Sequence, residues 1–129
     1  MFNKKNYNFN ELPDYFSILK NDLHLSKVAM GFISLPAGKR YSFLHSHKEQ
    51  EEVYIVLQGT GVIQIDKEEI PLKAGDIVRV SPEAKRALKA GDEKLIAICC
   101  GGVTQGYPKQ KDTRTLIDDG IPLYDELPN

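Results

Sequence analysis

The stretch LHSHKEQEEVYIVLQG, residues 44–59, places two histidines just before a run with strand character, and it decides the fold. His45 and His47 are one residue apart, and a strand points alternate side chains to the same face. Two imidazoles on one face are a suitable pair of metal ligands. After a hairpin bend at 48–50, the carboxylate of Glu52 would stand opposite them. The alternative is a solvated turn without metal, with both histidines bonded to backbone carbonyls in the core.

The residues on either side repeat the strand pattern about every ten positions, with turn residues between the runs. No segment keeps the helical period over the eleven or more residues that an amphipathic helix needs. This pattern is typical of an all-β sandwich or barrel. Pro71, inside one run, predicts an edge strand or a strand start. The predicted strands cover 15–20, 27–38, 52–59, 60–66, 70–76, 77–82, 86–92 and 94–102.

The length of 129 residues suits a single domain, 1–129. We expect a barrel core at about 28–100, preceded by an arm or short edge strand at 1–15. The Pro-rich tail, 103–129, loses the strand rhythm. It is predicted to pack extended on the outside, with at most one short helix near 112–119.

The charge and the cysteines limit the partners and the compartment. The net charge is −1, and no basic stripe interleaved with aromatics appears, which argues against nucleic acid as a partner. No apolar run reaches membrane-spanning length, and the N-terminus lacks the apolar centre of a secretion signal. Cys99 and Cys100 are adjacent and would point to opposite faces of a strand, so we expect reduced core cysteines in a cytoplasmic protein. His24, in a polar stretch, is expected in a turn or on the surface.

Two ordered motifs frame the barrel core. Between Gly38 and Gly59 the chain carries His-x-His, four residues, a glutamate and six residues. Gly75 begins a second motif, Gly–Asp, in which Pro82 falls one position late. Together the motifs resemble those of the cupins, although the first spacer is six residues rather than the usual five. The resemblance implies a double-stranded β-helix, a barrel of the jelly-roll type.

The resemblance also implies a metal site. In cupins, two histidines and the glutamate of the first motif hold a metal together with a histidine of the second. His45, His47 and Glu52 match the first three positions, and such nitrogen and oxygen ligands suit manganese, iron, nickel or zinc. Arg86 stands at the fourth position, and it has no lone pair to give a metal. Either it points aside or binds an anionic ligand of the metal, or it forms a buried bidentate ion pair with Glu52 in a metal-free barrel.

The strand period also predicts the lining of the interior. Tyr54 shares the face of Glu52, and Phe43 shares the face of His45. With Arg86 they would line a site for a small-molecule ligand, and the guanidinium favours an anionic one. Plain core packing is the alternative role of the two aromatic side chains.

Three functions stay open at this point, because a barrel of this type hosts many chemistries. The first is a metal-dependent enzyme, an oxygenase or isomerase of the kind that the resemblance allows. The second is a non-catalytic sensor or binding module for a small anion, and the third is a metal-free structural barrel. We expect a homodimer, because the arm and the tail could exchange with a partner or lie across it. Frayed termini are the alternative.

Overall fold

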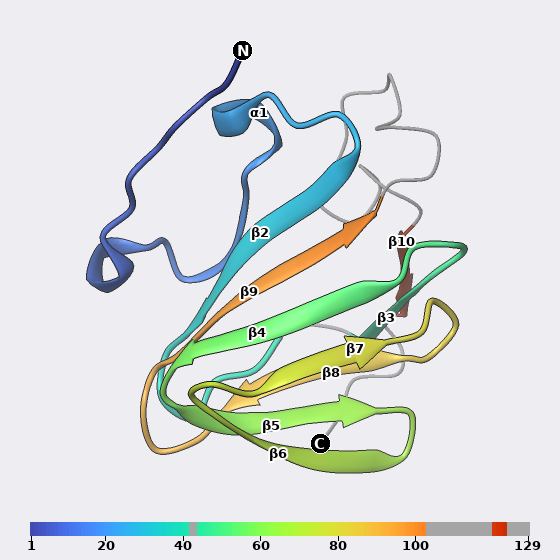
Figure 1. Cartoon of the computed structure of the whole chain (residues 1–129). Coiled ribbons are helices and arrows are strands. Elements are labelled where there is room, and N and C mark those ends of the chain that lie inside the picture. Colours follow the sequence, from blue (N-terminus) through green and yellow to red (C-terminus); the bar gives the residue numbers. More distant parts are fainter. Residues whose placement is uncertain (42–43, 103–119, 124–129) are drawn as a thin grey trace.

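The computed structural model of the chain describes residues 1–41, 44–102 and 120–123. Within them the chain forms two five-stranded sheets that lie face to face (Figure 1). The elements are η1 (Phe9–Glu11, a 3-10 turn), β1 (Tyr15–Ile18), α1 (Lys20–Leu23), β2 (Val28–Leu35), β3 (Leu44–His47), β4 (Glu52–Gln58), β5 (Thr60–Ile65), β6 (Glu68–Lys73), β7 (Ile77–Val80), β8 (Arg86–Ala90), β9 (Leu95–Gly102) and β10 (Gly120–Leu123).

The chain passes back and forth between the two sheets, as a jelly roll requires. The first sheet has the strand order β1-β2-β9-β4-β7, and the second has the order β10-β3-β8-β5-β6. All the pairings are antiparallel, and many neighbours in space are distant in sequence, such as β2 with β9 and β5 with β8. The prediction of an all-β jelly-roll barrel is therefore confirmed.

The main core lies between the sheets, and the period-two pattern of the strands builds it. In β4, Glu52, Tyr54 and Val56 are buried, whereas the residues between them are only half-buried. Each strand thus turns one set of side chains into the barrel. The aliphatic side chains of the interior include Ile33, Leu35, Ile63, Leu88 and Leu95.

The outer face of the first sheet is partly covered by the N-terminal segment. The rings of Tyr7 and Phe9 lie 5.1 Å and 5.7 Å from the ring of Phe32 on β2. Leu12 and Leu19 complete a second buried cluster there. Residues ahead of β1 therefore bury apolar area on the outside of the barrel, which contributes to its stability.

The predicted strands are present with shifted ends, and two local details are new. The polar break after β1 forms the short helix α1, which ends at exposed His24 in the left-handed conformation (φ 53°). β10 forms within the tail, while the helix expected near 112–119 lies outside the described residues. Pro71 lies in β6, an edge strand, as predicted. Among the described residues, no helix is long and apolar enough to cross a membrane.

Gly59, at the end of β4, shows why the first motif closes with a glycine. Its φ is +85°, in the left-handed region that favours glycine. A Cβ at this position would also collide with the carbonyl oxygen of Lys94. The tight turn into β5 and the close approach of the segment before β9 therefore both require that Gly59 has no side chain.

Candidate metal centre

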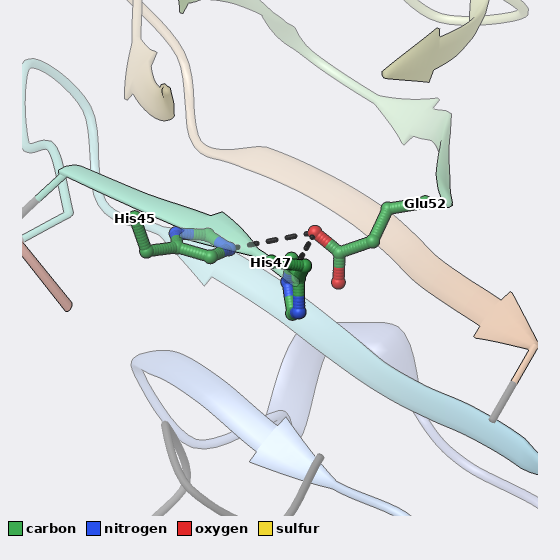
Figure 2. Close-up of side chains that lie close together, drawn as sticks. All are labelled: His45, His47 and Glu52. Carbon is green, nitrogen blue, oxygen red and sulfur yellow. Dashed lines mark hydrogen bonds and ion pairs between the residues drawn. The ribbon is translucent and has the colours of Figure 1, made fainter. Parts of the chain in front are cut away.

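The two histidines and the glutamate come from strands of opposite sheets. His45 and His47 lie on β3 in the second sheet, and Glu52 begins β4 in the first. Residues 48–51 carry the chain across the barrel between them. The expected hairpin at 48–50 is therefore wrong, because β3 and β4 do not pair with each other. Glu52 nevertheless faces the histidines, across the interior between the sheets (Figure 2).

The side chains converge on one oxygen atom. The Nε2 of His47 lies 3.1 Å from Oε1 of Glu52, and the Nε2 of His45 lies 3.4 Å from the same atom. One candidate ligand atom from each residue lies within 4.8 Å of the other two. His47 and Glu52 are buried and His45 is half-buried. The three residues that the sequence singled out thus lie together at one point.

Glu52 has further hydrogen-bond partners inside the barrel. The hydroxyl of Tyr54 donates to Oε1 at 2.8 Å. The side-chain amide of Gln50 and the thiol of Cys99 both donate to Oε2, each at 3.2 Å. Such donors stabilise an ionised carboxylate in a low-dielectric interior.

The electrostatics of the site keep the carboxylate charged. Burial alone would raise the pKa of Glu52, but hydrogen bonds and charges from His45 and His47 hold it well below its usual range. Burial, together with the neighbouring carboxylate, raises the pKa of Tyr54 and of Cys99 well above their ordinary values. The hydroxyl and the thiol therefore stay protonated at neutral pH and act as donors to Glu52.

Arg86 lies in the barrel beside this cluster, as the second motif predicted. It is fully buried, with 0% exposure, and it faces His45 where β8 pairs with β3. Its terminal nitrogens donate to the carbonyl oxygens of Ser81 (2.8 Å) and Pro82 (3.3 Å). Only its Nε approaches Glu52, at 3.8 Å from Oε1. The bidentate ion pair that we considered is therefore absent, and a single long contact takes its place.

The remaining candidate residues lie in different places. Tyr54 is fully buried at the site, whereas Phe43 lies outside the described residues. Glu51 points outward and pairs with exposed Arg79 at 2.9 Å, as strand parity predicted. Sequence reasoning missed Gln50 as a partner of the site, because it lies in an irregular link, and it assigned Cys99 only to core packing.

The comparison with known families agrees with this geometry. A cupin domain model matches residues 31–100, which include most strands of both sheets, without β1 and β10, and all three candidate ligands. The chain belongs to the cupin family. The matched region also contains Arg86, the residue at the position where the resemblance implies a fourth ligand.

Among curated proteins, this cupin is similar to an uncharacterized protein of Methanocaldococcus jannaschii. The two are 29% identical over 108 residues, which cover 78% of this chain and 82% of that protein. It is also similar to an oxalate-binding protein of Thermotoga maritima, 33% identical over 58 residues. That second match covers 45% of this chain and 47% of the relative, so this cupin spans about half of that relative's length.

Solved structures give the same fold. A cupin protein from Bacteroides fragilis superposes with a TM-score of 0.68 at 31% identity, covering 89% of this chain and 92% of that one. A Thermotoga maritima protein described as a predicted oxalate decarboxylase superposes with a TM-score of 0.59 at 24% identity, covering 67% and 77%. At that identity the second likeness shows the fold alone.

The ligand set of this cupin fits a divalent transition metal. Two imidazole nitrogens and one carboxylate oxygen form a mixed set, which suits manganese, iron, nickel or zinc better than an all-sulfur site would. Three protein ligands also leave positions for other ligands, as in catalytic zinc and non-haem iron sites. His45, His47 and Glu52 could therefore hold a metal that is open to a small molecule.

Proposed function

We propose that this cupin binds a divalent transition metal through His45, His47 and Glu52, and that a small anionic molecule binds beside the metal. The convergence of three ligand atoms within 4.8 Å inside the barrel carries the proposal. When bound, the ion would supply Lewis acidity to an oxygen of the ligand. The chain itself orients the ligand set, excludes water and places a fixed cation nearby.

That cation is Arg86. Its Nε is buried, and no hydrogen-bond acceptor for it lies in the part of the chain that the structure describes. A buried donor without an acceptor costs about 1–3 kcal/mol. A carboxylate oxygen of a bound ligand would satisfy this N–H group, which supports Arg86 as a ligand-binding residue. Tyr54 and Phe43 stay proposed lining residues of the same site.

The ligand class that we propose is a small carboxylate such as oxalate. A negatively charged ligand would be attracted both by Arg86 and by a divalent ion. The similarity to the oxalate-binding protein of Thermotoga maritima supports the same class. Oxygenase or isomerase turnover is the catalytic form of this proposal, and sensing of the anion is its non-catalytic form. Product formation from the bound ligand separates the two forms.

Metal content is the decisive measurement. Protein purified without a histidine tag is loaded with manganese, iron, nickel or zinc, dialysed and submitted to elemental analysis, with a His45→Ala/His47→Ala double variant as control. We expect about one ion per chain for the wild type and none for the variant. Calorimetric titration with oxalate then tests the anion, in metal-loaded and metal-free protein. Zero metal with all four ions would contradict the proposal.

A metal-free barrel is the second candidate, and the surroundings of Glu52 favour it. Tyr54, Gln50 and Cys99 already donate to the carboxylate, and Arg86 lies close to it. In that case the ionic cluster only specifies the packing of the interior. A chelator would then leave the unfolding temperature unchanged, whereas loss of a bound metal would lower it.

We also propose that two copies of the chain pair through the outer face of the first sheet. Ile77, Ile55 and Ile98 are cross-strand neighbours on β7, β4 and β9. Ile77 is 67% exposed, and the other two are half-buried. The same row on a second copy could cover this apolar strip around a two-fold axis.

A further inference from the structure

The two oxygens of the Glu52 carboxylate have different surroundings. Oε1 faces the Nε2 atoms of His45 and His47 at 3.4 Å and 3.1 Å. Oε2 accepts hydrogen bonds from Gln50 and Cys99, each at 3.2 Å. Oε1 also accepts a hydrogen bond from the Tyr54 hydroxyl at 2.8 Å, which leaves one of its two lone pairs for an ion. Both lone pairs of Oε2 are already used by Gln50 and Cys99.

We propose that Cys99 and Gln50 are positioning residues that make Glu52 a monodentate metal ligand, bound through Oε1 alone. A carboxylate can bind a metal through one or both oxygens, and two donors on Oε2 oppose the rotation that would bring it to the ion. Outer partners of this kind orient metal ligands and tune the metal. The inference rests on the proposed metal site and names how that site controls its coordination number.

The backbone of β9 is shaped to admit Gln50. Gly101 is the register partner of Glu52 on β9. A Cβ on Gly101 would lie 2.8 Å from Cγ and 3.0 Å from Cδ of Gln50, and 2.5 Å from the carbonyl oxygen of Glu51. Gln50 is 2% exposed, so its amide is held inside the protein. The bare Cα of Gly101 therefore opens the space through which Gln50 reaches Oε2.

Strand β9 places the thiol of Cys99 beside Oε2 of Glu52, whereas the two histidines contact Oε1. Cys99 is the register partner of Tyr54, and both side chains are buried between the sheets. Cys100, one residue later, alternates to the other face and is half-buried. The two adjacent thiols thus have different surroundings, and Cys100 serves as a matched control for Cys99.

Cobalt(II) in the full chain tests the proposal, because its visible bands weaken when the coordination number rises to six. In Cys99→Ala, and in Gln50→Leu, Oε2 loses a donor and is released toward the metal. We expect weaker visible bands and a cobalt affinity lower by about 10–100-fold. Cys99→Ser keeps a donor and should restore the wild-type spectrum, and Cys100→Ala should not change it.

Substitution of Gly101, the glycine that leaves space for Gln50, provides an independent test. Gly101→Ala should displace Gln50 together with the backbone at Glu51, and should weaken the visible bands in the same direction as Gln50→Leu. Gly102→Ala is its control, because a Cβ on Gly102 would have no heavy atom within 4 Å among the described residues. Circular dichroism and unfolding temperature identify any variant that is not folded. Where Gly101→Ala does not fold, the Gln50→Leu spectrum decides.

The outcomes separate the inference from the function on which it rests. If wild-type protein binds no cobalt, the proposed metal site fails and the inference fails with it. If wild type and variants bind cobalt with the same spectrum, the metal site stands and the positioning role of Cys99 and Gln50 is overturned. A changed spectrum in Cys100→Ala or Gly102→Ala as well would also overturn it, because the effect would then not depend on Oε2.

Discussion

Arg86 lies directly opposite His45 where β8 pairs with β3, and its Nε is 3.8 Å from Oε1 of Glu52. A permanent cation therefore stands at the edge of the candidate metal centre, at the position where the cupin motif implies a fourth ligand. The carbonyl oxygens of Ser81 and Pro82 fix its terminal nitrogens, so the charge cannot easily swing away. A cation in this position weakens the binding of a metal ion and strengthens the binding of an anion.

Replacing this cation with a ligand should strengthen metal binding. We expect Arg86→His to raise the affinity for zinc or nickel by about tenfold or more, or about 1.4 kcal/mol, because a charge is removed and a nitrogen ligand is gained. Competition with a chelating dye measures the dissociation constant. Arg79→His, on the exposed face of β7, is the control. Unchanged affinity in Arg86→His would mean that position 86 does not face the metal.

The charge of Glu52 should matter for both metal and stability. In Glu52→Gln we expect metal binding to be lost, since the neutral amide is a poor ligand for a divalent ion. We also expect the metal-free fold to lose about 3–5 kcal/mol, because the buried Arg86 then lacks a counter-charge. Elemental analysis and urea unfolding measure the two effects. Glu51→Gln, an exposed neighbour, should change unfolding by no more than about 0.5 kcal/mol.

The low pKa of Glu52 predicts an acid limit of the metal-free protein. A carboxyl whose pKa is lower in the folded state stabilises the fold above its unfolded value of about 4.3. That contribution is lost as the pH falls from there through the folded pKa. The wild type should therefore exceed Glu52→Gln in unfolding free energy at neutral pH, and the gap should shrink at acid pH. Urea titrations at a series of pH values measure the gap, and a gap that stays constant would refute this assignment.

The apolar strip of Ile77, Ile55 and Ile98 on the first sheet predicts a dimer that a single charged substitution should dissociate. Ile77→Glu places a carboxylate at its most exposed position and should convert the dimer to a monomer without unfolding it. Sedimentation equilibrium measures the molecular mass. Lys73→Glu, on β6 of the other sheet, should leave the dimer intact. A wild-type protein that is monomeric at all concentrations would contradict the proposed dimer.

The sequence predicted the barrel because runs with strand character recur about every ten residues, with turn residues between them. In β4 the buried positions Glu52, Tyr54 and Val56 follow from period two alone, and the same rule placed Glu51 and Arg79 outside. These assignments depend on neighbouring residues within one strand. They do not require knowledge of which strands pair.

The parts that were missed depend on how distant segments meet. The step of the chain from one sheet to the other at 48–51 looks like a hairpin in the sequence, since both are short polar links. Gln50 has no periodic neighbour, and its role appears only when Gly101 is seen beside it. β10 is short and contains Gly120 and Pro122, so it lacks the run of β-branched and aromatic residues that marks β4.

The position of β10 sets a lower limit on the length of a working protein. It pairs with β3 along both histidines, with Gly120 opposite His47 and Pro122 opposite His45. On its other side, β3 meets β8, with His45 opposite Arg86. A chain shortened to the part that the cupin domain model matches would leave the imidazole-bearing strand at an open border of its sheet. Transplanting the centre into another barrel would therefore require its C-terminal neighbour as well.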